Sequence, residues 1–131
     1  MKLINNAGFD LLQADKEMCW EEAMVFPVIA NSEKFGGFND WVLPDLHTLM
    51  NLKIISRKKK GDFWSSSTSV DCNDAWYVNF SSGIGFDLYK FGYCMVRLVR
   101  ASQCSAIIEA GKQKMISLSV QRTSRYGMSS R

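Results

Sequence analysis

Two alternating stretches, AWYVNF and IGFDLY, constrain the fold more than any other part of the sequence. In the first stretch Trp76, Val78 and Phe80 share one side of an extended chain, while Tyr77 and Asn79 take the other side. The Ser-Ser-Gly between the two stretches is typical of a hairpin turn. We therefore predict two antiparallel strands joined by a short loop.

The second stretch, IGFDLY, alternates in the same way. Ile84, Phe86 and Leu88 share one face of this strand, and Asp87 and Tyr89 lie on the opposite face. The three apolar residues are the ones that we expect to face the core.

Further extended segments lie on both sides of the hairpin. The segment FWSSS at 63–67 predicts a strand that runs into a polar loop, and YCMVRLVR at 93–100 predicts a last strand. We expect these segments and the hairpin to form an antiparallel meander built from local connections. Two shorter extended segments are expected at 2–12 and at 41–43.

The first of two helices precedes this sheet. Trp20, Ala23, Met24 and Val28 recur at helical spacing and form one apolar stripe. Pro27 disturbs the pattern, because proline lacks a backbone donor and clashes with the preceding turn. The helix therefore either kinks or ends there.

The second helix is predicted to begin at Pro44 or Asp45. Proline is favoured in the first turn of a helix, where no backbone donor is needed. Leu46, Leu49 and Met50 then lie on its buried face.

The charge of the chain is concentrated at its C-terminal end. Residues 1–100 carry eleven Lys and Arg against twelve Asp and Glu, whereas residues 101–131 carry five against one. We predict a folded domain over 1–100 and a basic extension over 101–131. The extension contains a short helix at 104–110, with a strand also possible at 116–120, and a frayed end from Gln121.

Residues that carry catalysis are nearly absent. His47 is the single histidine, which excludes any metal site that needs two. Glu21 and Glu22 are adjacent and point to different sides of a helix, so they form no catalytic pair. The four cysteines form no CxxC pair, and no phosphate-binding loop or nucleophile elbow is present. We expect no catalytic residues, no cofactor and no structural metal.

One loop offers a weak cation site. Asp71, Asn73 and Asp74 lie close together, and calcium prefers six to eight oxygen ligands. The spacing matches no EF-hand, and turns rich in Asp and Asn are common without a metal. The polar turn is the favoured interpretation.

The two ends and the cysteines suggest a compartment. No continuous apolar segment follows Met1, so we expect no cleaved signal, and no run of about 18 apolar residues suggests a membrane span. A cytoplasmic location with reduced thiols is the default, with association with a virion or a cell surface as the alternative. Since only the tail is basic, we do not expect nucleic acid as a partner.

The composition of the C-terminal strands suggests a binding surface. Tyr, Asn and Asp side chains combine rigid rings with short hydrogen-bonding groups, which is common in adaptable binding sites. An ordinary solvated sheet face would have a similar composition. The candidate ligand-binding residues are Thr68, Asp71, Asn73, Asp74, Tyr77, Asn79, Asp87, Tyr89 and Tyr93.

Three stretches in this order resemble a known family. They are MCWEEA at 18–23, NDWVLPDLHTLMNL at 39–52 and FWSSSTSVDCNDAWYVNFSSGIGFDLYKFGYCMVRLVR at 63–100. Together they are similar to the bacterial domain found at the C-terminus of collagen-like (Lcl) adhesins. The resemblance covers about residues 9–100.

The resemblance implies a fold similar to those of C-type lectins and the formylglycine-generating enzyme. That fold is α+β, with two helices packed on a small twisted antiparallel sheet. Related domains serve as variable ligand-binding proteins, so the loops and outward strand positions after Trp64 are implied to form any site. Fold alone does not determine function.

The sequence also departs from the family pattern. Val42 stands where arginine is common, and about thirty residues follow the closing VRLVR. Cys94 and Cys104 differ in spacing from the paired cysteines of the enzyme, and CNDAW is only partly similar to the calcium motif of lectins.

Three functions follow as hypotheses. The first is a non-catalytic recognition domain that binds a protein or glycan ligand through residues 65–95. The second is a small intracellular inhibitor or regulator from a mobile element, acting by protein–protein interaction. The third is an oxidase-like enzyme related to the formylglycine-generating enzyme, which the cysteine spacing disfavours.

Overall fold

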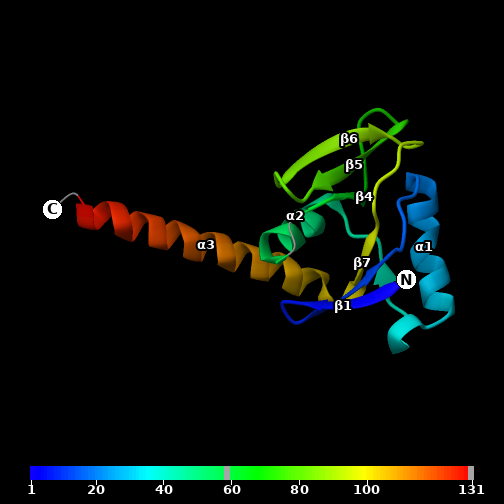
Figure 1. Ribbon diagram of the computed structural model, residues 1–131, viewed down its shortest axis with the longest axis horizontal. Helices are drawn as coiled ribbons and strands as arrows, with labels where there is room; N and C mark the ends of the chain where they lie inside the picture. Colours follow the sequence, from blue (N-terminus) through cyan, green and yellow to red (C-terminus); the bar gives the residue numbers. More distant parts are fainter. Residues whose placement is uncertain (58–59, 130–131) are drawn as a thin grey trace.

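The computed structural model describes residues 1–57 and 60–129 of the chain. Figure 1 shows helices packed against two small antiparallel sheets, which confirms the predicted α+β class. The elements in chain order are β1 (Lys2–Asn6), β2 (Phe9–Gln13), α1 (Trp20–Ser32), the 3-10 turn η1 (Phe35–Gly37), β3 (Trp41–Val42), α2 (Leu46–Ile55), β4 (Asp62–Thr68), β5 (Asp74–Asn79), β6 (Ile84–Tyr89), β7 (Arg97–Arg100), the 3-10 turn η2 (Ala101–Gln103) and α3 (Cys104–Ser129).

The first sheet joins the two ends of the domain, with the strand order β1-β2-β7-β3. The predicted segment 2–12 is a hairpin rather than one strand, because Ala7 and Gly8 both have positive φ angles. Positive φ at both loop residues is the geometry of the tightest hairpin turns. β2 then pairs with β7, which places Leu12 opposite Leu98.

The second sheet has the order β4-β5-β6 and contains the predicted hairpin. Asn79 pairs with Ile84 at the end of β5 and β6, and the backbone N–H of Gly83 donates to the Asn79 carbonyl at 2.7 Å. Gly83 has a φ of 76°, a conformation that glycine adopts at little cost. The meander prediction is confirmed for these three strands.

The last strand lies elsewhere, and the meander prediction is wrong for it. β7 pairs with β2 on one side and with β3 on the other. Arg97, Leu98 and Val99 are all buried. A strand buried in this way is most stable in the middle of a sheet, where both of its edges are hydrogen-bonded.

Helix α1 continues through Pro27 to Ser32, so the proline does not end it. The predicted apolar stripe is only partly correct: Ala23 is buried, but Met24 and Val28 are 37% and 65% exposed. The buried side runs through alanines instead, because small side chains let the helix approach the sheets closely.

Helix α2 begins at Leu46 with Asp45 as its N-cap, whose carboxylate accepts the N–H of Thr48 at 2.7 Å. Leu49 is buried as predicted, whereas Met50 is exposed. Figure 1 shows α2 between the second sheet and the first part of α3. Thr48, Asn51 and Leu52 lie on the side of α2 away from Met50 and are buried. The packing of α3 against α2 explains their burial.

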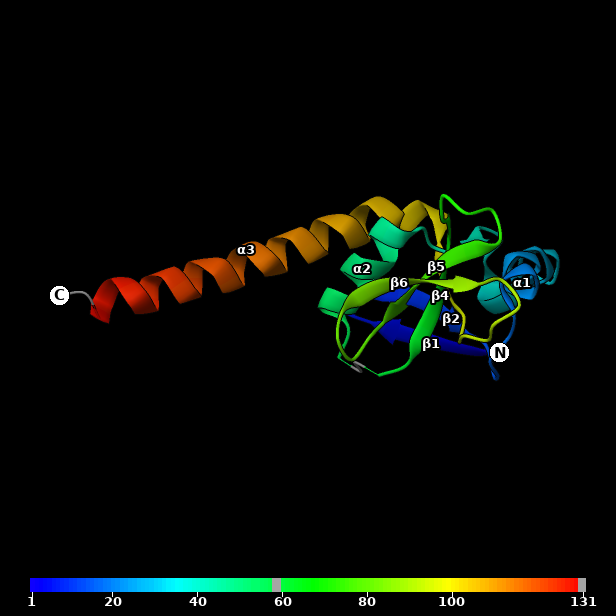
Figure 2. The same cartoon turned by 90° about the horizontal axis from the view of Figure 1, so that it is seen from above.

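Helix α3 extends from Cys104 to Ser129, so the strand considered for 116–120 is wrong. Ile107 is fully buried, and a Cβ atom built on Gly111 would lie 2.7 Å from the Cβ atom of Asn51. The first part of α3 therefore packs tightly on α2, and only a glycine fits at that contact. Beyond it, the helix leaves the body of the protein, as Figures 1 and 2 show. The division of the chain at residue 100 stays a prediction.

Three tryptophans connect the layers. Each indole N–H donates to a backbone carbonyl, as buried indoles usually do. The pairs are Trp20 with Ser65 at 2.9 Å, Trp41 with Phe35 at 2.9 Å, and Trp64 with Met18 at 2.8 Å. Trp20 and Trp64 thus fix α1 and the chain before it onto the second sheet, whereas Trp41 joins β3 of the first sheet to η1.

Candidate functional site

All nine predicted binding residues lie in or beside the sheet β4-β5-β6. Their side chains are exposed at Thr68, Asp71, Asn73, Asp87, Tyr89 and Tyr93 and half-buried at Asp74, Tyr77 and Asn79. The strand register shows that the residues within β5 and β6 lie on two different faces of the sheet. Directly opposite residues share a face of an antiparallel pair, and Asp74 lies opposite Tyr89.

The two faces of this sheet therefore carry different residues. Asp74, Asp87 and Tyr89 share one face. Tyr77 and Asn79 lie on the other face, opposite Phe86 and Ile84. The structure does not bring the nine residues together into a single cluster.

The loop before β5 is a rigid polar turn. The Asp71 carboxylate accepts the N–H of Asn73 at 3.0 Å, and the Asp71 carbonyl accepts the N–H of Asp74 at 3.0 Å. The Asn73 carbonyl in turn accepts the N–H of Lys90 at 2.9 Å. This turn is therefore fixed against the end of β6, and it matches the favoured Asx-turn interpretation.

Tyr77 and Asn79 serve the internal structure of the sheet. The Tyr77 ring lies edge-on to Trp64 with 6.3 Å between centroids. Burial, followed by the nearby charge of Asp62, raises the pKa of the Tyr77 hydroxyl. The Asn79 amide donates to Asp62 at 2.7 Å and accepts the N–H of Ser82 at 2.8 Å.

The most prominent surface feature is a group of exposed aromatic rings along and after β6. Phe86, Tyr89, Phe91 and Tyr93 are 43%, 53%, 67% and 64% exposed. Phe86, however, lies on the opposite face of the sheet from Tyr89, with its ring 5.7 Å from that of Tyr77. The rings of Tyr89 and Phe91 lie 5.1 Å apart. Of these four residues, Phe86 was predicted to face the core and Phe91 was missed. No local signal distinguishes Phe86 from a core residue, because its exposure depends on which layer covers the sheet.

β6 is also an edge strand of its sheet. The N–H of Lys90 bonds to Asn73, and hydrogen-bonded pairs recur at every second residue of an antiparallel ladder. The backbone N–H and C=O groups of Gly85 and Asp87 therefore point away from β5. In the described part of the chain, no other strand pairs with this edge.

Two features argue against the oxidase-like alternative, which would need reactive paired cysteines. Burial raises the pKa of the Cys94 thiol to about 12, with Asp62 adding to the effect, so the thiol stays protonated near neutral pH. Cys94 and Cys104 also belong to different core clusters, the second of them around Leu49 and Phe80. Among the described residues, all four cysteines are free.

Cation sites and membrane spans have little support in the described residues. His, Cys, Asp and Glu side chains form no group of three that could hold a metal ion there. None of the described helices is both long and apolar enough to cross a bilayer.

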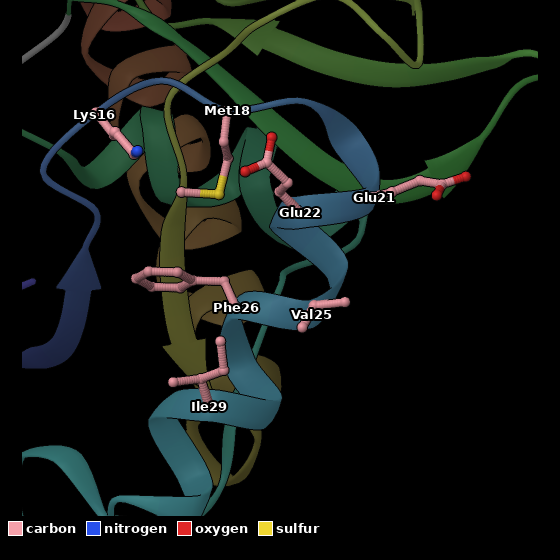
Figure 3. Close-up of a pocket in the computed structure, with 7 residues that line it drawn as sticks. All are labelled: Lys16, Met18, Glu21, Glu22, Val25, Phe26 and Ile29. Atoms are coloured by element: carbon pink, nitrogen blue, oxygen red, sulfur yellow. The ribbon is translucent and has the colours of Figure 1, made fainter.

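A groove of about 460 Å³ runs along α1. Figure 3 shows the charged side chains at one end of it and Ile29 at the other. The lining residues are Lys16, Met18, Glu21, Glu22, Val25, Phe26 and Ile29. Sequence reasoning missed this groove, because none of the residues in the predicted apolar stripe of α1 lines it.

The comparisons with known proteins identify one family. The model of the Lcl C-terminal domain matches residues 4–100, which is well over half of the chain. No curated protein matches the chain. The matched region begins in β1 and ends at the last residue of β7, so it contains both sheets and the helices α1 and α2. The chain therefore belongs to the Lcl C-terminal domain family.

Proposed function

We propose that the chain is a non-catalytic recognition domain that binds a protein or glycan ligand through residues 65–95. The observation that carries this proposal is the group of exposed rings of Tyr89, Phe91 and Tyr93 at the end of β6, beside an edge with which no strand pairs in the described residues. Large rings that stay solvent-exposed on a folded domain are characteristic of binding surfaces.

The composition of the surface suits both ligand classes. Tyr89 and Phe91 offer adjoining ring faces, and Asp87 and Asp74 offer carboxylates on the same side of the sheet as Tyr89. Rigid rings lose little conformational entropy on binding, and short polar groups provide hydrogen bonds. A protein ligand could also add a strand to the free edge at Gly85 and Asp87.

One part of the surface is held in place before any ligand binds. The Ser69 hydroxyl donates to the Asp87 carboxylate at 3.2 Å, and the turn around Asp71 is closed by its own hydrogen bonds. A preorganised site costs less ordering entropy on binding than a mobile one.

A second candidate function is that of a small regulator acting by protein–protein interaction. The observation in its favour is the projecting part of α3, which carries exposed apolar and basic residues. Affinity capture of full-length chain and of a chain ending at residue 114 distinguishes the two. A partner lost only on truncation supports the regulator, and one retained supports the β6 surface.

A binding screen with two classes of ligand tests the recognition proposal. We suggest a glycan array and a peptide library, followed by calorimetry of each hit with Tyr89→Ala and Asp87→Ala. The matched control is Val28→Ala, an exposed apolar residue on α1. We expect at least tenfold weaker binding for one of the two site variants and unchanged binding for the control. Unchanged binding in both site variants would rule out the proposed site.

A further inference from the structure

The middle of α3, from Lys112 to Val120, presents apolar side chains to solvent. Every residue from Lys112 to Val120 is exposed, and Met115, Ile116, Leu118 and Val120 are about half exposed. Figures 1 and 2 show this stretch projecting from the body. A helix without tertiary contacts is only marginally stable in water, so this stretch gains most from a partner.

The charge of this stretch restricts the partner. Lys112 and Lys114 are exposed, and Glu109 is the only acidic residue after Arg100. Two parallel α3 helices would bring these lysines together, and an antiparallel pair would still join two helices that each carry four Lys and Arg against Glu109, so like charges repel in both cases. The charge pattern therefore favours an acidic partner surface over pairing of α3 with itself.

The groove on α1 has the matching properties. Val25 and Ile29 line it and are about half exposed, and Glu21 and Glu22 lie at one end of it. Lys16 also lines the groove, so the acidic character depends on the glutamates of the helix. Figures 1 and 2 place α1 and the projecting part of α3 on opposite sides of the body. The α3 of the same copy cannot reach the groove.

We propose that the α3 helix of one copy docks into the α1 groove of a second copy. The contact would pair Lys112 of α3 with Glu21 of α1 and cover the exposed apolar residues that follow each of them at every fourth position. It involves neither β6 nor its aromatic rings, so it goes beyond the proposed function.

The spacing of the two helices supports this pairing. Glu21, Val25 and Ile29 recur at every fourth residue, and Lys112, Ile116 and Val120 have the same spacing. Rows of this spacing form the ridges that interlock when two helices pack. In a parallel orientation Lys112 lies against Glu21, and the two apolar residues that follow in each helix meet. A helix that inserts a row of apolar residues into a groove is a common mode of recognition.

The proposed contact is head-to-tail, because it joins different surfaces of the two copies. Such a contact leaves one free groove and one free α3 in every assembly unless a ring closes. We therefore expect a concentration-dependent series of assemblies rather than a single dimer.

Light scattering coupled to size-exclusion chromatography tests the proposal on the full chain. We expect the mass to rise above the 14.9 kDa of the monomer as the concentration approaches about 1 mM. The charge-reversal variants Glu21→Lys/Glu22→Lys and Lys112→Glu/Lys114→Glu should each remain monomeric, because groove and helix then carry the same charge. An equimolar mixture of the two should regain the higher mass, since each helix again meets a groove of opposite charge. Lys2→Glu, an exposed reversal on β1, is the matched control and should associate like the original chain.

Three results would overturn the proposal. The first is an original chain that stays monomeric over the whole concentration range. The second is association that survives the Glu21→Lys/Glu22→Lys reversal, which would place the contact elsewhere. The third is a mixture of the two reversed variants that stays monomeric although the original chain associates.

Discussion

The guanidinium of Arg97 lies 4.5 Å from the centroid of the Phe63 ring and 5.5 Å from that of Phe80. Arg97 is only 4% exposed, and both its Nε and Nη2 atoms donate to the side-chain carbonyl of Gln13, at 3.2 and 2.8 Å. In the described part of the chain, no carboxylate forms a salt bridge with it. Two aromatic faces and one amide thus stabilise a buried cation where the two sheets meet.

Replacing Arg97 by lysine should destabilise the fold although the charge is retained. An ammonium group cannot stack on Phe63 as a planar guanidinium does, and it cannot donate to Gln13 in the same geometry. We expect the free energy of unfolding to fall by about 1–3 kcal/mol in urea titrations. The same replacement at exposed Arg57 is the control and should have almost no effect. Equal stability of the two variants would show that the stacked geometry contributes nothing.

From the Asp40–Arg100 pair we expect the stability of the fold to decrease at acidic pH. Burial alone would raise the pKa of Asp40, but hydrogen bonds from Arg100 and Ser102 outweigh it and lower this pKa. A lowered pKa in the folded state contributes stability above the unfolded pKa of about 3.9, and that contribution is lost as the pH falls further.

The matching variant is Asp40→Asn. Because both partners are about a quarter exposed, we expect it to lose only about 1 kcal/mol near neutral pH. The difference from the original chain should shrink below about pH 4, where the carboxylate becomes protonated. Urea titrations at neutral and acidic pH measure it, and a difference that does not change with pH would contradict the charge-based account.

From the buried thiol of Cys94 we expect the free energy of unfolding to depend on pH in the alkaline range. The thiol has a pKa of about 12 in the folded chain because it is buried, against 9.0 as the ordinary value. The unfolded state therefore loses its proton first, and the free energy of unfolding should fall as the pH rises from about 9 towards 12.

The Cys94→Ala variant should show a shallower loss of stability over this alkaline range than the original chain. The absolute stability of the variant can differ, so the slope against pH is the quantity to compare. Cys72→Ala, at an exposed position, is the control and should keep the original slope. Identical slopes in all three chains would mean that Cys94 is not ionised on unfolding.

Because the first part of α3 packs on the body, we expect the effect of truncation on stability to depend on where the chain is cut. Removing residues 101–131 deletes Ile107 from the cluster that contains Leu49 and Phe80. We expect a loss of about 2–5 kcal/mol, the range for removing a large buried side chain. Removing only residues 115–131 should have little effect, because the stretch from Lys112 to Val120 is exposed. A chain of residues 1–100 as stable as the full chain would instead support a domain that ends at residue 100.

The hairpin of β5 and β6 could be predicted from sequence because its information is local. Alternation and a Ser-Ser-Gly turn predict both strands. The register was not predicted, because the turn also includes Phe80 and Asn79 therefore pairs with Ile84. The position of β7 could not be predicted in this way, because its partners β2 and β3 are far away in the chain. The family resemblance identified the fold where local patterns could not.

The exposure of the predicted binding residues could be predicted from sequence only in part. Tyr89 and Tyr93 are exposed as expected, but Tyr77 packs against Trp64. Alternation tells which residues share a face of a strand, and it does not tell which face another layer covers. The same limit explains the strand considered for 116–120, where an exposed helix has no buried face to produce a helical pattern.

The central claim is that ligands bind at β6, and amide chemical-shift mapping by NMR tests it most directly. The labelled chain is titrated with the sugar or peptide recovered from the binding screen. We predict the largest shifts at the amides of Gly85, Asp87 and Tyr89, with little change along α1. Shifts confined to α1 or α3, with those of β6 unchanged, would contradict the claim.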